Sequence, residues 1–413
     1  MTLSKSASTS KFSLDDLWDV VLIGVVVATT FLGFRVAVPL AIGLMAAYVF
    51  NPSRLRQDLG ALDRGAMVLL GLVWSFAIYM AILTVFRWVP YDDVHIYRYR
   101  GLEHPGEWIF MAFLFSISLV RFCGIQNLNH WMQKIFLPSL WVGVGFAICI
   151  YAFVYLKIGP ENSACRTGLL TFNSNVFAFH FAAMAGFASA YFMARNPKAL
   201  VVWIMLAIFT TCMVALTGSR MAIVSFVVVC LLIYGFISGR WLGGWALLAI
   251  VLVCSLALGF TWSILLECDF LGRFQVLSDA ADMEKSQSTA RRFELWKDTI
   301  AALQGNWAFG LGVRQDAEIA FPNAHIHSQY LSWALWGGVP ALLLGLGLLL
   351  SMPFYGLAKI GWQGFAIGGA YTGFVGLYSL FDSVMYFAIP FGQFLVVFAF
   401  VAGVLHAMSK ATK

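Results

Sequence analysis

The chain has 413 residues, of which 61% are hydrophobic and only 11% are charged, and its mean hydropathy is +0.83. So few charged side chains could not cover the surface of a soluble protein of this length, which excludes that class. The net charge of +6 comes without an arginine-rich arm, a zinc-finger spacing or a ladder of alternating aromatic and basic residues. We therefore expect no nucleic-acid binding.

Uncharged runs of about 20 residues follow one another, and each can cross the hydrocarbon core of a membrane as a helix. The runs are continuously apolar rather than alternating, which favours helices. We expect about twelve spans. They cover residues 18–34, 36–51, 66–86, 108–122, 135–156, 170–193, 199–216, 220–238, 242–265, 328–350, 357–380 and 385–407. The predicted fold is an all-α polytopic membrane protein surrounded by membrane lipids.

These spans divide the chain into three parts. Residues 1–265 hold the first nine spans, 266–327 form a long polar loop with an amphipathic helix, and 328–413 hold the last three spans. Basic residues of the short loops set the expected orientation. They favour cytoplasmic N- and C-termini, which places the long loop outside, in the periplasm of a Gram-negative cell. The polar tail continues directly into the first span, so we expect no cleavable signal peptide.

Seven cysteines are scattered along the chain with no CxxC pair, which argues against a thioredoxin-like or cysteine zinc motif. Cys165 and Cys268 fall in polar loops that this topology places on one side of the membrane. They could form a disulfide if that side is oxidising, and two free thiols are the alternative.

The first candidate site is Thr217-Gly218-Ser219-Arg220, which joins two predicted spans at the outer face. Gly218 permits a tight turn, and Ser219 can cap the helix that follows. Free N–H groups at a helix start attract anions, and Arg220 adds a forked positive charge there. The motif predicts a small phosphate or diphosphate site. A snorkelling arginine at a helix end is the alternative.

The second candidate site is the predicted amphipathic helix of the long loop, which begins near Ser288. Its apolar residues recur at helical spacing, and we expect that face to lie on the spans. These residues are Phe293, Trp296, Ile300 and Leu303. Arg291 and Arg292 fall in the predicted first turn, where a cation opposes the helix dipole unless an anion is nearby. A solvated basic face is the alternative.

Two histidines, His325 and His327, end the long loop. Histidine accepts a proton readily near neutral pH, so His327 is a candidate general base. A metal pair is disfavoured because no acidic or cysteine cluster lies near in the sequence, and a loop histidine without a catalytic role stays open. Asp382 is the only acidic residue after Glu318. It could pair with an arginine, orient His327 or cap the final span.

Arg220, Arg292, His327 and Asp382 come from separate segments, yet the predicted topology brings them to one membrane face. Unrelated charged residues would be expected at both faces. Their shared position predicts a site in which basic groups bind a diphosphate beside a histidine base, and which a lipid-linked substrate can enter from the side. Arg35, at the turn between the first two spans, is a further candidate.

Four motifs in this order resemble the O-antigen ligase superfamily. Thr217–Arg220 resembles its Ser-Arg helix start, and Arg292-Phe293-Glu294-Leu295-Trp296 is similar to its Arg-x-x-x-Trp loop helix. Asn306–Gly312 resembles its Asn-Pro-x-x-Gly-x-Gly, with Trp307 replacing proline. His327-Ser328, nine residues and then Gly338 resembles its His-[Asn/Ser/Gln]-x9-Gly. Ala341 stands where the family has Gly, Thr or Tyr.

The resemblance implies a glycosyltransferase of the Gram-negative inner membrane that acts at the periplasmic face. Its donor would be a polysaccharide on undecaprenyl diphosphate, and its acceptor a sugar hydroxyl of lipid A-core. No nucleotide sugar, cofactor or metal is implied. We expect catalytic roles for His327, Arg220 and Arg292. Substrate-binding roles are expected for Arg291, His325, Arg35 and Asp382.

Two kinds of alternative remain. An O-antigen polymerase or a protein O-oligosaccharyltransferase of the same superfamily would share the donor and differ in the acceptor. A secondary transporter would suit about twelve helices, but transporters tend to carry internal repeats and midplane charges. His180 is the only strong midplane candidate here, and we expect it to be an ordinary core histidine.

Overall fold

The computed structural model describes residues 14–32, 43, 48, 50–86, 104–158, 174–195, 200–217, 219–238, 287–313, 326–382, 385 and 388–411. Every regular element in these ranges is a helix. The first half contains α1 (Leu14–Leu32), α3 (Pro52–Gly60), α4 (Arg64–Phe86), α5 (Pro105–Gly124), α6 (Leu128–Trp131), the π-helical turn η2 (Met132–Phe136) and α7 (Leu137–Ile158). The second half contains α8 (Ser174–Arg195), α9 (Leu200–Leu216), α10 (Arg220–Ser238), α14 (Gln287–Ala302), α16 (Gln329–Ser379) and α17 (Ala388–Ala411).

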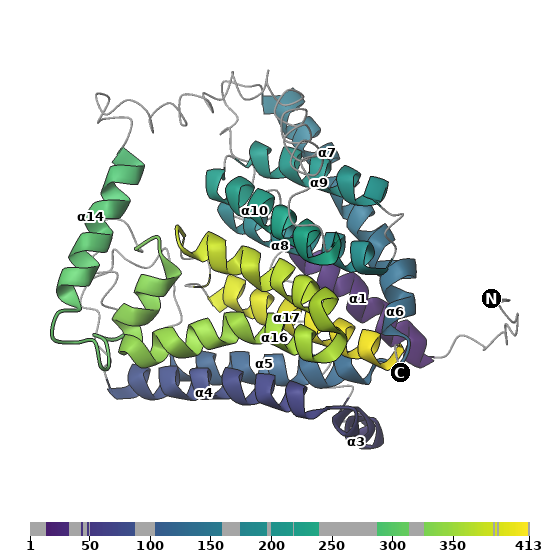
Figure 1. Cartoon of the computed structure of the whole chain (residues 1–413), viewed down its shortest axis with the longest axis horizontal. Helices are drawn as coiled ribbons and strands as arrows, with labels where there is room; N and C mark the ends of the chain where they lie inside the picture. The colour runs from purple at the N-terminus through teal and green to yellow at the C-terminus, as the bar shows by residue number, and fades with distance from the viewer. Residues whose placement is uncertain are drawn as a thin grey trace, which may run out of the picture.

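The long helices form one bundle (Figure 1). α17 packs against α5 and α16, and α16 also packs against α4, α8 and α10. Five helices of the described chain are long and apolar enough to cross a membrane. They are Arg64–Phe86, Pro105–Gly124, Asn175–Arg195, Gln329–Ser379 and Phe391–Ala411. The helical fold class and the multi-pass character thus agree with the sequence-based expectation.

Most predicted spans coincide with an observed helix, but their number stays a prediction. α4, α5, α7, α8, α9, α10 and α17 overlap the spans expected there. The span predicted at 242–265 lies outside the described residues, as does most of the span at 36–51.

α16 combines the two predicted spans at 328–350 and 357–380 and bends twice. The backbone leaves helical geometry at Gly337–Gly338 and at Ile360–Gly361. Gly338 has φ 68 and ψ −161, and Gly361 has φ 67 and ψ −150, a combination that glycine alone adopts without strain. The bends divide α16 into a short first arm and two long arms (Figure 1).

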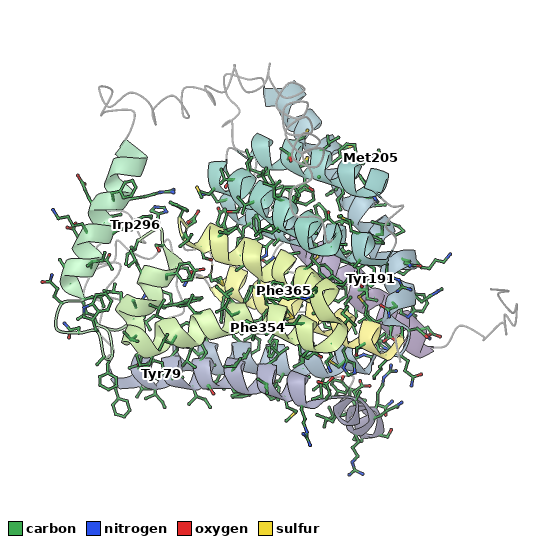
Figure 2. All side chains as sticks on the ribbon, in the orientation of Figure 1. Tyr79, Tyr191, Met205, Trp296, Phe354 and Phe365 are labelled. Atoms are coloured by element: carbon green, nitrogen blue, oxygen red, sulfur yellow. The ribbon has the colours of Figure 1, made fainter. Side chains whose placement is uncertain are left out.

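The two long arms fold back on each other at the second bend. Phe354 and Phe365 meet across them with ring centroids 6.1 Å apart, and both are labelled in Figure 2. Gly356 and Gly364 lie so close that a Cβ on either would collide with the carbonyl of the other. Small residues let helix backbones approach in this way, as is common between membrane helices.

The glycine-containing segment after α14, residues 303–313, is bonded to the first bend of α16. The Leu311 amide donates to the Leu335 carbonyl at 2.6 Å, and the Val339 amide donates to the Trp307 carbonyl at 2.7 Å. A Cβ at Gly338 would collide with that Trp307 carbonyl. The motif glycines therefore allow close backbone packing here. Trp307 contributes its main chain, so the replacement of proline leaves this contact in place.

One end of the bundle holds a buried charged cluster. Arg121 of α5 is 4% exposed and binds two carboxylates, Asp58 of α3 at 3.1 Å and Asp19 of α1. The Tyr48 hydroxyl also donates to Asp58, at 2.8 Å. Arg121 interrupts the uncharged run of the predicted span at 108–122, yet α5 continues to Gly124 because these carboxylates neutralise the guanidinium.

A second ion cluster lies at the start of α4, around Asp63. Lys359, next to the second bend of α16, donates to Asp63, and His406 Nδ1 of α17 lies 2.8 Å from the same carboxylate. Burial alone would raise the pKa of Asp63, but the hydrogen bonds from Lys359, the Ala66 amide and His406 lower it below its ordinary value. The cluster fastens the second bend to α4 and α17.

α4 runs from this cluster towards the first bend of α16. Near its far end the Tyr79 hydroxyl donates to the Gly337 carbonyl at 2.7 Å. Figure 2 labels Tyr79 on α4, on the side of the bundle where α14 lies. The ion cluster at Asp63 and the first bend therefore mark opposite ends of the bundle, with apolar helix between them.

We predict that Gly338→Ala lowers the free energy of unfolding by more than about 2 kcal/mol, because alanine is strained at this φ and ψ and its Cβ meets Trp307. Gly347→Ala is the matched control, since it lies in the same helix with nothing within 4 Å of its Cβ. Thermal unfolding in detergent measures both. Equal stability of the two variants would contradict the backbone packing described above.

We also predict that Arg121→Met destabilises the protein by ~3–5 kcal/mol, because Asp19 and Asp58 then stay buried without their cation. A triple variant that adds Asp19→Asn and Asp58→Asn should recover much of the loss. Thermal unfolding tests this. If the triple variant is less stable than Arg121→Met alone, charge burial is not the cause.

Candidate functional site

The candidate site lies at the end of the bundle where α14 runs across it (Figure 1). Four polar segments meet there: the start of α8, the start of α10, the turn before α16 and the turn after α16. Their contacts link residues as far apart in sequence as Asn175 and Asp382.

His327 stands immediately before the cap of α16, in an unusual backbone conformation. Its φ is 57, and it is the only non-glycine residue with positive φ in the described chain. Such a conformation is uncommon outside glycine and persists where surrounding contacts hold it. Its neighbours Ile326 and Ser328 are buried, while its own side chain is 23% exposed. The imidazole is therefore held in place and still reachable.

Asp382 follows the last turn of α16 and faces His327. The Asp382 Oδ1 atom lies 3.6 Å from His327 Nδ1. The other carboxylate oxygen, Oδ2, accepts hydrogen bonds from Asn175 Nδ2 at 3.2 Å and from the Tyr378 hydroxyl at 3.1 Å. Asp382 is only 7% exposed. These contacts supply the partners that a buried carboxylate requires.

Tyr378 also reaches the start of α10. Its hydroxyl lies 3.4 Å from Ser219 Oγ, and both residues are buried. The Ser219 amide is bonded to the Thr217 hydroxyl at 3.2 Å, which shapes the turn before α10. Arg220 is the first residue of α10. The predicted anion motif thus lies at the same end of the bundle as Asp382.

α14 is docked by the first and last residues of its Arg-x-x-x-Trp motif. Arg292 Nη1 donates to the Phe381 carbonyl at 3.0 Å, and Trp296 Nε1 donates to the Ile326 carbonyl at 3.1 Å. Residues four apart share one face of a helix, so both side chains point to the bundle. Figure 2 labels Trp296 on α14. Arg292 thus holds the residue before Asp382, and Trp296 holds the residue before His327.

Of the four residues predicted to form the apolar face of the loop helix, two do not lie against the bundle. Leu295, Thr299 and Leu303 are fully buried, whereas Phe293 is 59% exposed and Ile300 is 45% exposed. The polar bonds of Arg292 and Trp296 fix which face meets the bundle, and this face differs from the one that apolar spacing indicated. α14 begins at Gln287, so Arg292 lies in its second turn rather than its first.

The structure describes the other predicted residues incompletely. Arg220 and Arg291 have a described backbone, in α10 and α14, but their side chains fall outside the described part. Arg35 and His325 lie wholly outside it, as do Cys165 and Cys268. His180 is buried within α8, as expected for a core histidine, but its Nε2 atom has no hydrogen-bond partner among the described residues, so the satisfied histidine that we expected is confirmed only in its burial.

Sequence patterns did not single out Tyr378 or Asn175. Tyr378 lies in an apolar run and resembles any core aromatic residue. Its spacing of four residues from Asp382 was the one available signal, because residues four apart lie on one side of a helical segment. Asn175 carries no comparable signal, because it meets Asp382 across 207 positions of sequence.

The assembled groups suit acid–base chemistry next to an anion. A carboxylate beside one imidazole nitrogen orients the ring and favours a proton on that nitrogen, which leaves the other nitrogen to accept one. A guanidinium nearby can bind phosphate oxygens. Within the described residues, no group of three or more His, Cys, Asp or Glu side chains could hold a metal ion.

Apolar helices of spanning length with a histidine, a carboxylate and an arginine at one end define a multi-pass membrane protein with a candidate acid–base site. Residues 200–346 match the family model described as O-antigen ligase. This match confirms the predicted relationship to the O-antigen ligase superfamily and indicates a function of the O-antigen ligase or polymerase type. The matched range contains Arg220, Arg292 and His327 and ends before Tyr378 and Asp382. No curated protein matched the chain.

We predict that Trp296→Phe loosens α14, because phenylalanine keeps an aromatic ring but loses the hydrogen bond to Ile326. One such bond contributes ~1 kcal/mol, so hydrogen exchange of the α14 amides should speed up by about 5- to 10-fold. Ile300→Leu, at an exposed position of the same helix, is the control and should leave exchange unchanged. Unaltered exchange in Trp296→Phe would contradict this docking.

Proposed function

We propose that this chain is an O-antigen ligase, which transfers polysaccharide from undecaprenyl diphosphate to a sugar hydroxyl of lipid A-core. The proposal places the reaction at the periplasmic face of a Gram-negative inner membrane. The observation that carries it is the contact of His327 with buried Asp382, beside the docked Arg292, in a chain that matches the O-antigen ligase family.

In this proposal His327 is the general base. Asp382 lies at Nδ1, so Nε2 is the nitrogen that accepts the proton of the acceptor hydroxyl. The carboxylate stabilises the imidazolium that forms. The acceptor oxygen attacks the anomeric carbon as the bond from that carbon to the diphosphate oxygen breaks. The bonding electrons leave with undecaprenyl diphosphate, and direct attack inverts the anomeric centre.

The arginines are proposed to bind the diphosphate and to stabilise the charge that develops on it. Arg292 donates one N–H to Phe381, and a guanidinium has five N–H donors, so others remain for phosphate oxygens. Arg220 begins α10, where helix N–H groups also attract anions. Arg291, His325 and Arg35 are proposed as further substrate-binding residues, and Asp382 acts through His327.

We predict that His327→Ala lowers transfer by about 10²- to 10⁴-fold, the usual contribution of a general base. Arg220→Ala and Arg292→Ala should also abolish capped lipopolysaccharide, because each removes a positive charge that would bind the diphosphate. Lys297→Ala is the control for Arg292, since Lys297 is an exposed cation on the same helix. Each variant is expressed in a deletion strain and read on a lipopolysaccharide gel, with the membrane level of the protein checked by immunoblot.

The gel of the deletion strain also separates the candidate reactions. Free lipid-linked antigen together with unmodified core indicates a ligase, whereas single-repeat caps on the core indicate a polymerase. Near-normal capping by His327→Ala at a normal protein level would rule out His327 as the base.

A further inference from the structure

The two oxygens of the Asp382 carboxylate have different surroundings. Oδ2 accepts from both Asn175 and Tyr378, while Oδ1 faces His327 Nδ1 at 3.6 Å. Two donors from two different helices on one oxygen restrain rotation of the carboxylate about its last bond. The direction in which Oδ1 points is therefore set by Asn175 and Tyr378.

The proton of Tyr378 fixes the direction of the neighbouring hydrogen bond. A tyrosine hydroxyl has one proton, and Tyr378 donates it to Asp382 at 3.1 Å. In the 3.4 Å contact between Ser219 and Tyr378, Ser219 must then be the donor. The result is a directed series from Ser219 to Tyr378 to Asp382, which ends at His327. It connects the residue before Arg220 with the proposed base.

We propose that Tyr378 and Asn175 are positioning residues for His327. They hold Asp382 so that its Oδ1 keeps Nδ1 of the imidazole turned inward and Nε2 turned towards the reacting hydroxyl. Through Ser219, Tyr378 also fixes the start of α10 relative to the base. The 3.6 Å separation is longer than a hydrogen bond, and catalytic contacts are often this long in the absence of substrate. The catalytic meaning of this inference rests on the proposed function.

Asp382, which follows α16, is a charged residue that contacts His327 in the described part of the chain. Tyr378, near the end of α16, is bonded to that carboxylate, and Arg292 of α14 is bonded to the residue before Asp382. A role limited to packing would affect only the stability of the bundle. A positioning role also changes the orientation and proton position of the imidazole, and this difference can be measured.

Tyr371 offers a matched control for Tyr378. It lies two turns earlier on the same helix and is equally buried, and its hydroxyl donates to the Phe394 carbonyl at 3.1 Å. Tyr371→Phe therefore loses a buried tyrosine hydrogen bond, as Tyr378→Phe does, without touching Asp382. A loss of stability common to both variants can then be separated from an effect on His327.

The first test measures the tautomer of the His327 imidazole and needs no enzymatic reaction. The full chain is labelled with ¹⁵N-histidine and studied by solid-state NMR in lipid, with His327→Gln to assign the His327 signals. We expect one tautomer in the wild type, with the proton on Nδ1. The double variant Tyr378→Phe with Asn175→Ala should show a second tautomer, and Tyr371→Phe should match the wild type. Unchanged His327 signals in the double variant would overturn the proposal.

The second test reads the reaction. Tyr378→Phe should lower kcat by about 5- to 20-fold with KM unchanged, as expected for one misplaced hydrogen-bonded group. Tyr371→Phe should keep wild-type kcat, and equal losses in both variants would mean a packing role and overturn the proposal.

If the wild type transfers no polysaccharide but the NMR signals respond as expected, the proposed function fails and the positioning role of Tyr378 and Asn175 stands. Normal transfer with unresponsive signals would mean that the proposed function stands and the positioning role fails.

Discussion

A buried carboxylate that needs partners determines how this end of the protein is assembled. Asp382 is almost entirely removed from solvent, and its partners come from α8, from α16 and from the turn before α16. Burial of an ionisable group at the end of an apolar bundle costs several kcal/mol unless such partners are present. The same contacts hold the His327 imidazole beside it. Stability of the bundle and placement of the proposed base therefore depend on one set of hydrogen bonds.

The bend at Gly338 and the attachment of α14 also position the residues of the candidate site. The bend at Gly338 lets the first arm of α16 fold against residues 303–313, and it sets the position of the chain that carries His327. α14 then attaches to the turns on both sides of the site through Arg292 and Trp296. The Arg-x-x-x-Trp spacing is explained by this double attachment. One helix face fastens the residue before the carboxylate and the residue before the histidine.

The helical fold and the placement of several site residues at one end of the bundle could be predicted from the sequence, because hydropathy and the charges of the loops carry both. Long uncharged runs are read directly as helices, and the orientation set by the basic residues of the short loops placed Arg292, His327 and Asp382 at one membrane face. The bends of α16 were missed because Gly337-Gly338 resembles any small-residue pair in an apolar run. Phe293 and Ile300 were misplaced because apolar periodicity ignores the polar bonds of Arg292 and Trp296. Asn175 and Tyr378 could not be found because their roles arise only from tertiary contact.

Transfer by the purified protein in lipid tests the proposed ligase function most directly. The chain is mixed with undecaprenyl-diphosphate-linked antigen and rough lipopolysaccharide, with EDTA present and no added nucleotide. We expect a ladder of capped lipopolysaccharide on a gel. No ladder, when an active control ligase caps the same acceptor from the same donor, would contradict it.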